Sequence, residues 1–245
     1  MDDHDWQVLA RYDVVLKRAI ELAASLAHHG DDCCSCDTYG QVLANGRAVQ
    51  ILAADDLGDQ ALMLTRPMQD AFVILTYLTL HPEAVGAFRD FRRIRFALQR
   101  QKDGSQDPLL QDSIDEVRAK HGWCIGQEQG WTFKYLRDRP CPHGPDRPTH
   151  RCQVTMAILE QEASYGSADL ANYLRHNFRR SSGKLHTDPR SVTPAGMPSI
   201  GPVVPLETAA LIMAFAAHEI VEFHRFPRAC TAIVNAIDEA AALLA

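Results

Sequence analysis

The chain has 245 residues, of which 46% are hydrophobic and 23% charged, and its formal net charge is −6. This composition is ordinary for a globular protein and excludes a mostly disordered or collagen-like chain. No apolar run reaches the roughly 18 residues of a membrane span, and the first residues are acidic where a signal peptide is basic. We therefore expect a cytoplasmic protein without membrane contact.

Helical periodicity dominates the chain. Apolar residues recur at steps of three, four and seven over residues 5–29, which predicts one apolar helix face. A second helical stretch covers about 39–80, and Pro67 should kink or restart the helix there. Its part 61–80 is the most apolar segment. We expect 61–80 to be the core helix, packed against 5–29 and 206–226.

The remaining elements follow the same pattern. A Cys-, His- and Pro-rich irregular insertion is expected at about 122–152, and an irregular loop at 187–205. No stretch alternates in polarity as a strand does. The fold prediction is therefore all-α: a single helical-bundle domain of seven or eight helices spanning residues 1–245. Further helices are expected at about 83–101, 108–121, 153–165, 168–180, 205–226 and 227–245.

Two stretches are basic although the chain as a whole is acidic. Residues 86–103 and residues 174–190 each carry a net charge of +4. An acidic body with two basic stretches permits a focused contact with a polyanion and disfavours an indiscriminate one. The same pattern also fits arginines on a solvated helix face.

The stretch 173–189 carries a candidate catalytic arrangement at a predicted helix end. His186 follows Arg179 by seven residues and Arg180 by six. Seven residues bring two side chains to one helix face, provided that Gly183 does not break the helix. Histidine can move protons near neutral pH, and arginine can hold a phosphate. The alternative is a capped helix end with exposed basic residues.

A family resemblance rests on two segments. Leu64-Thr65-Arg66-Pro67-Met68-Gln69-Asp70-Ala71, followed downstream by Tyr173, Ser182 and His186, resembles the motifs of bacterial helical families of the HEPN type. The resemblance covers about residues 40–225, and Pro67 and Gly183 depart from it. Many HEPN proteins act in toxin–antitoxin and phage defence as metal-independent ribonucleases.

The resemblance implies a homodimer that acts on single-stranded RNA, with an antitoxin or defence protein as a further partner and no cofactor. Each histidine would assist attack of the ribose 2′-hydroxyl, and each arginine would stabilise the charged transition state. The implied catalytic residues are Arg179, Arg180, His186 and Tyr173, and the implied RNA-binding residues are Arg175, Lys184, Arg92 and Arg93.

Three aromatic residues are interleaved with the arginines of the helix predicted at 83–101. Phe88, Phe91 and Phe96 could stack on RNA bases, although phenylalanines at helical spacing are more often core residues.

Two other functions remain open. The first is a non-catalytic helical interaction module, in which the Arg–His segment only caps a helix and dimerises. The second is a metal-dependent enzyme for a small molecule that uses His218, Glu219 and Glu222, with Asp70 as a further candidate ligand.

Two groups of cysteines and histidines have metal-ligand chemistry. The spacing of the first group is tighter than in usual zinc sites, so we predict no stoichiometric zinc and no metal site. The groups are Cys141, His143, His150 and Cys152, and Cys33, Cys34 and Cys36 with His28 and His29.

Overall fold

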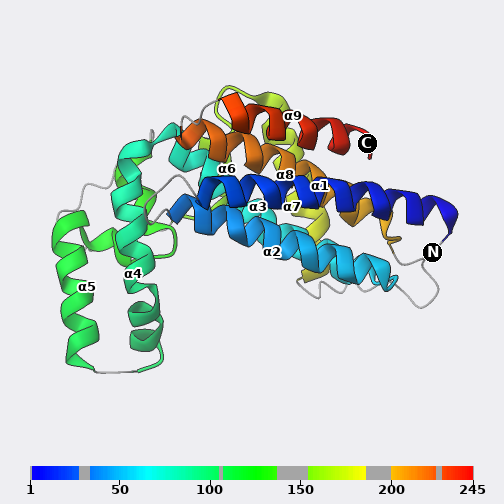
Figure 1. Ribbon diagram of the computed structural model, residues 1–245. Coiled ribbons are helices and arrows are strands. Elements are labelled where there is room, and N and C mark those ends of the chain that lie inside the picture. The colour runs from blue at the N-terminus through cyan, green and yellow to red at the C-terminus, as the bar shows by residue number, and fades with distance from the viewer. Residues whose placement is uncertain are drawn as a thin grey trace. The chain divides into compact units, whose positions relative to one another are not determined.

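The computed structural model describes residues 2–27, 34–104, 107–136, 154–185, 200–224 and 228–244 (Figure 1). These residues form nine α-helices and three short 3-10 helices, and none of them is in a strand. The all-α prediction is confirmed. The described part has one α-helix more than the upper predicted number, because the stretch 39–80 divides in two.

The helices follow one another with short connections. The α-helices are α1 (Asp3–Ala27), α2 (Cys34–Ala54), α3 (Gly58–Leu80), α4 (Val85–Lys102), α5 (Pro108–His121), α6 (Met156–Ala163), α7 (Ala168–Leu185), α8 (Val203–His224) and α9 (Arg228–Ala242). The 3-10 helices are η1 (Pro82–Ala84), η2 (Trp123–Gly126) and η3 (Gly130–Tyr135).

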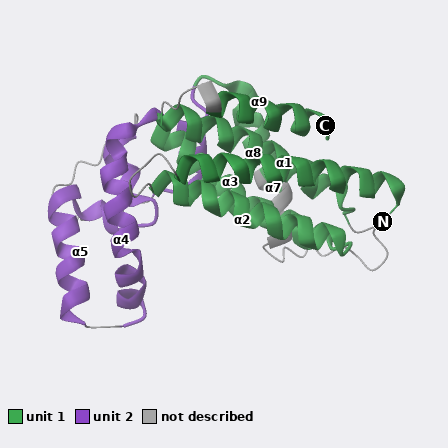
Figure 2. Cartoon of the chain, in the orientation of Figure 1, with its two compact units in different colours: residues 1–79, 166–245 green, residues 80–165 purple. Residues whose placement is uncertain are grey.

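The chain divides into two compact units (Figure 2). Unit 1 comprises residues 1–79 and 166–245, and unit 2 comprises residues 80–165. Unit 1 thus contains α1 to α3 and α7 to α9, so that segments from both ends of the sequence build one core. Unit 2 contains α4 to α6 and the 3-10 helices.

The core of unit 1 is a bundle of long helices. Helix α1 packs against α2, α8 and α9, and both α2 and α9 also pack against α8. Helix α3 is deeply buried and contacts α8 where the rings of Phe72 and Phe215 stack at 5.8 Å. The predicted core segments are therefore in the core, and α2 and α9 complete it.

Helix α8 is long and apolar enough to cross a membrane by length and composition alone. Its apolar side chains are mostly buried against the neighbouring helices of unit 1, as in the central helix of a bundle.

The predicted stretch 39–80 breaks between α2 and α3. Asp56 has a φ of 58°, a left-handed conformation that aspartate tolerates better than most residues. At Gly58 the backbone of Ile200 and Gly201 passes so close that a Cβ atom would collide with it. Helix α3 then continues through Pro67, which is exposed, so the predicted restart at this proline is wrong.

In unit 2, α4 and α5 pack against each other. The side chain of Asp107 accepts a hydrogen bond from the Leu109 amide and Pro108 occupies the first turn, which together start α5. The following segment, expected to be irregular, forms η2 and η3. Its Trp131 ring lies 4.6 Å from that of Phe88. Residues 137–153 and 186–199, within the predicted insertion and loop, lie outside the described residues.

Candidate functional site

The two helices that carry the motif residues meet in unit 1. Gln69 on α3 is 1% exposed, and its side-chain amide donates a hydrogen bond to the Leu174 carbonyl of α7 at 3.0 Å. Arg66 and Asp70 flank Gln69 on the same face of α3. Arg66 is 8% exposed, and its Nη2 lies 2.7 Å from Asp70 Oδ1. Residues that are about a hundred positions apart in the sequence thus come together.

Tyr173 and Asn177 supply the polar groups of α7 on its inner side. The Tyr173 hydroxyl donates to the Thr208 carbonyl at 3.4 Å, and its ring meets that of Phe215 edge-on at 5.6 Å. Burial raises the pKa of Tyr173 to about 12, against a smaller opposing effect of its hydrogen bond with Asn177. The phenol is therefore neutral at physiological pH, and its hydroxyl takes part in hydrogen bonds. We call Arg66, Gln69, Asp70, Tyr173 and Asn177 the α3–α7 polar interface.

Helix α7 has a second, outward side. Arg175 and Arg179 are exposed, and they lie four residues apart, one turn along the helix. Tyr173 and Arg179 are six residues apart, which at about 100° per residue leaves them about 120° apart around the axis. Tyr173 and Arg179, both among the implied catalytic residues, therefore lie on different sides of α7.

Gly183 does not interrupt α7, which extends to Leu185. Arg179 and His186 are seven residues apart, so one further helical residue would bring His186 to the side of Arg175 and Arg179. We call this side, with Arg175 and Arg179, the outer face of α7. His186 lies outside the described residues, as do the side chains of Arg180 and Lys184, so the predicted grouping of these residues stays a prediction.

The other predicted RNA-binding residues are on α4 in unit 2. The Arg92 guanidinium lies 5.9 Å from the Phe88 ring centre, and Arg93 pairs with Glu116 of α5 at 3.3 Å. Phe88 is buried, whereas Phe96 is 66% exposed and has the Arg100 guanidinium 5.8 Å from its ring centre. Of the three phenylalanines considered for stacking, Phe96 is thus the most exposed, and Phe91 is half-buried.

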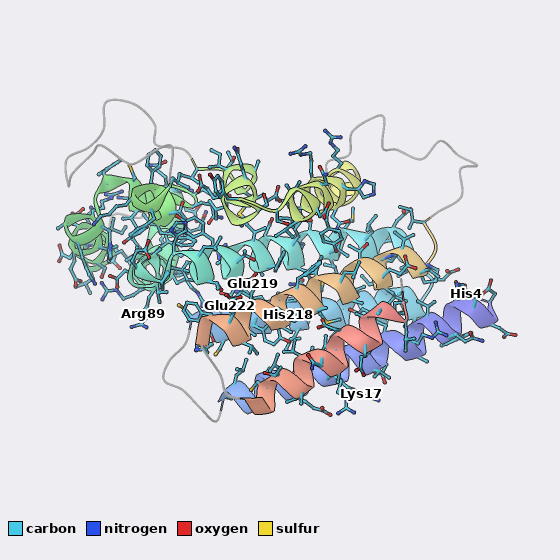
Figure 3. All side chains as sticks on the ribbon, turned by 90° about the horizontal axis from the view of Figure 1, so that it is seen from above. His4, Lys17, Arg89, His218, Glu219 and Glu222 are labelled. Carbon is cyan, nitrogen blue, oxygen red and sulfur yellow. The ribbon has the colours of Figure 1, made fainter. Side chains whose placement is uncertain are left out.

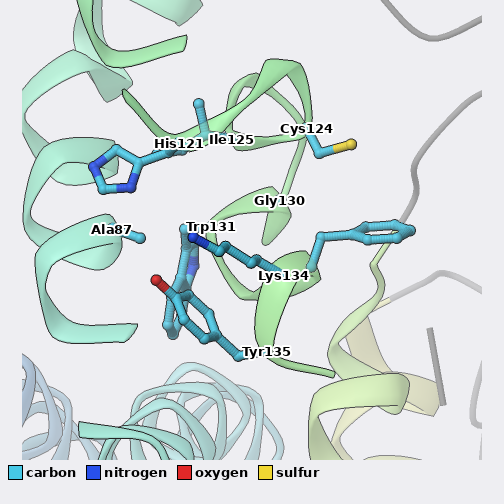
Figure 4. A pocket seen from close by; sticks show the side chains of 9 residues that line it. Ala87, His121, Cys124, Ile125, Gly130, Trp131, Lys134 and Tyr135 are labelled. Carbon is cyan, nitrogen blue, oxygen red and sulfur yellow. The ribbon is translucent and has the colours of Figure 1, made fainter. Parts of the chain in front are cut away.

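Unit 2 also contains a small pocket between η2, η3 and the end of α5 (Figure 4). His121 lines it, and His121 Nε2 lies 2.7 Å from Asp90 Oδ2, which also accepts a hydrogen bond from Lys120. Burial raises the pKa of Asp90, but the hydrogen bonds and charges of Lys120 and His121 outweigh burial and leave the pKa lowered. The cavity holds about 10 Å³, room for about one water molecule and far less than the roughly 300–1,000 Å³ of ligand sites. The pair therefore serves to join α4 to α5.

The candidate metal ligands of α8 point to different neighbours (Figure 3). His218 Nε2 lies 2.7 Å from Asp238 of α9, whereas the Thr79 hydroxyl of α3 donates to the Glu219 carbonyl at 3.3 Å and the Glu219 carboxyl group lies near Thr79 and Thr76. Asp70 pairs with Arg66 instead. No group of three or more His, Cys, Asp or Glu side chains that could hold a metal occurs among the described residues. Cys141, His143, His150, Cys152, Cys33, His28 and His29 lie outside them.

Sequence reasoning missed Gln69 and Asn177 as members of the polar interface. The available signal was an amide side chain at a core-facing position of an apolar helix, since a buried amide needs a partner. Gln69 stands between Met68 and Ala71, both buried.

No protein-family model, curated protein or solved structure matches the chain. The resemblance to HEPN domains therefore rests on the motif residues of this chain alone.

Proposed function

We propose that this protein binds single-stranded RNA on the outer face of α7 and cleaves it without a metal ion. The observation that supports this proposal best is the α3–α7 polar interface. The segments that resemble the two HEPN motifs are joined there through the hydrogen bond from Gln69 to the Leu174 carbonyl.

The energetics of the interface favour a functional role. Burying an ionised side chain costs several kcal/mol, and an apolar replacement of a buried ion pair is often neutral or stabilising. The buried Arg66 and its contact with Asp70 are thus a poor way to gain stability. A polar interface of this kind can instead hold α7 at one rotation and one axial position. Its hydrogen bonds form in only one arrangement of the helices. That rotation determines which residues face solvent.

The outer face of α7 has the chemistry that phosphodiester cleavage needs. Exposed arginines one turn apart can hold consecutive phosphates of a single strand and stabilise the charge that develops in the transition state. His186, which follows Leu185 in the sequence, is the proton carrier for attack of the ribose 2′-hydroxyl. The leaving oxygen needs a second proton carrier, and the His186 of a two-fold mate can supply it, so the proposal includes a homodimer.

The test uses the full chain, a fluorescent single-stranded RNA and an excess of chelator. His186→Ala should lower the cleavage rate by about 100-fold or more, as expected for removal of a general acid–base group. The matched control is His176→Ala, since His176 is an exposed histidine of the same helix. Arg179→Ala should lower rate and affinity, whereas Arg47→Ala, an exposed arginine of α2, should change neither.

Two results would refute the proposal: RNA that stays intact with the wild-type protein, or undiminished cleavage by His186→Ala. Cleavage that stops when chelator is added would instead indicate a metal-dependent enzyme. Intact RNA together with a dimeric mass in solution would favour the non-catalytic interaction module.

A further inference from the structure

A cysteine, a serine and a histidine meet where the first turn of α2 touches the last turn of α8. His224 Nε2 lies 2.9 Å from Ser35 Oγ and 3.8 Å from Cys36 Sγ. The Phe223 ring stands edge-on to the imidazole at 4.9 Å. Ser35 is fully buried, so its hydroxyl can orient the imidazole but cannot meet a ligand, whereas Cys36 is half-buried.

The helix end at Cys36 favours a thiolate. Cys36 is the third residue of α2, where the partial positive charge of a helix N-terminus stabilises an anion. His224, the last residue of α8, contacts the thiol, so proton transfer to the imidazole leaves the anion at the helix end that stabilises it.

The neighbouring charged groups do not replace the imidazole in this role. Asp37 on α2 and Glu222 on α8 are acidic and oppose a thiolate. On the helices that pack against α8, Glu21 of α1 pairs with Arg18, and Asp238 of α9 pairs with His218. His224 is thus a group in contact with Cys36 that can take its proton.

We propose that Cys36 is a nucleophilic thiol, activated by His224, that undergoes exchange with small disulfides. His224 accepts the thiol proton, and the Cys36 sulfur attacks one sulfur of the disulfide. The disulfide bond breaks, and its second sulfur leaves with the electron pair and takes the proton back from the imidazolium. Cys36 becomes a mixed disulfide, the small disulfide is the oxidant, and one small thiol is released.

This chemistry distinguishes Cys36 from the other described cysteines. Cys34, Cys124 and Cys230 are buried. A buried thiol reacts slowly, because the thiolate is the nucleophile and must be reached. The proposal is independent of RNA cleavage, since none of the groups involved belongs to the α3–α7 polar interface.

The experiment uses the full chain with Cys33, Cys141 and Cys152 replaced by serine, since these cysteines lie outside the described residues. The probe is 5,5′-dithiobis(2-nitrobenzoate), whose released thiol is coloured. One thiol per chain should react rapidly, and Cys36→Ser should abolish this phase. The rate should persist below the range near pH 8.5 where a free cysteine ionises.

Two variants on α8 test the role of the imidazole. His224→Gln should lower the exchange rate at about pH 6 by roughly five- to tenfold. Without the imidazole a smaller fraction of Cys36 is thiolate, and the slightly higher nucleophilicity of a more basic thiolate offsets this loss only in part. His218→Gln, a histidine of the same helix that pairs with Asp238, should leave the rate unchanged. A Cys36 rate that follows pH as a free thiol does would overturn the proposal, as would full reactivity in a folded His224→Gln protein. The pH profile of the parent protein decides the matter if that variant does not fold.

Discussion

Gly46 lies in the middle of α2 at a point where four helices meet. The Tyr12 hydroxyl of α1 donates a hydrogen bond to the Gly46 carbonyl at 2.8 Å. A Cβ atom at position 46 would lie 3.1 Å from the Met213 sulfur of α8, 3.2 Å from the Tyr12 hydroxyl and 3.5 Å from the Met68 methyl of α3. All three side chains are fully buried, so they have little room to move.

We therefore expect Gly46→Ala to destabilise the protein. Alanine is favoured over glycine in a helix by about 1 kcal/mol. Overpacking a buried site costs about 1–3 kcal/mol, and displacing the Tyr12 hydroxyl loses a hydrogen bond of about 0.5–1.5 kcal/mol. The net loss is about 0.5–3.5 kcal/mol. Gly40→Ala is the matched control in the same helix, because nothing lies within 4 Å of a Cβ there, and it should stabilise by about 0.5–1 kcal/mol.

Urea unfolding followed by circular dichroism measures both values. A loss of 1 kcal/mol lowers the melting temperature of a chain of this size by about 2–4 °C. Tyr12→Phe removes the oxygen that the new methyl group meets, so Gly46→Ala should cost about 1 kcal/mol less in that background. If Gly46→Ala stabilises the protein as much as Gly40→Ala does, the four helices are not packed as described.

Three further predictions follow from single side chains. Leu75→Ala should cost about 2–5 kcal/mol in urea unfolding because Leu75 is 1% exposed, and Ile74→Ala should cost less because Ile74 is only partly buried. By the sequence prediction α4 is a separate RNA-binding surface in unit 2, and there Phe96→Ala should weaken single-stranded RNA binding in anisotropy titrations by about 1–3 kcal/mol, whereas the exposed control Leu109→Ala should not. Burial raises the pKa of Glu219, against smaller opposing hydrogen bonds from Thr79 and Thr76, so the folded state favours the protonated acid. The stability that protonated Glu219 contributes is present below the pKa that its carboxyl group has in the unfolded chain. This stability is lost as pH rises through the pKa of the same group in the folded protein. Glu219→Gln should therefore raise the melting temperature at neutral pH and change it little near the ordinary pKa of 4.5.

The sequence predicted the helical class and much of the core, because apolar periodicity is strong in α1 and α3. It understated α2, whose buried side includes Ser35, Thr38 and Gly46. Small and polar residues at core positions weaken the apolar pattern, although they are what allows neighbouring helices to approach closely. The break at Asp56 depends on a left-handed backbone conformation, which a periodicity argument does not detect.

The candidate site was less accessible to prediction than the fold. Helical arithmetic alone separates Tyr173 from Arg179, so that correction needed no structure. The partners of His218 and Glu219 did need it, because they lie on α9 and α3 and no sequence spacing encodes them. His218 and Glu219 are adjacent in sequence but face different helices. Their proximity in sequence was therefore a poor basis for predicting a shared metal ion.

Helix α8 connects the two proposed sites and also keeps them apart. Thr208, in its first half, accepts the hydrogen bond of Tyr173, and His224 at its end contacts Cys36. Sixteen residues of α-helix separate these contacts by about 24 Å. Met213 lies between them, at the crowded junction around Gly46. A mixed disulfide at Cys36 could affect α7 by shifting the whole of α8. The close packing around Gly46 opposes such a shift. Cys36→Ser should consequently leave RNA cleavage at the wild-type rate, and a large change would show that α8 transmits a displacement between its ends.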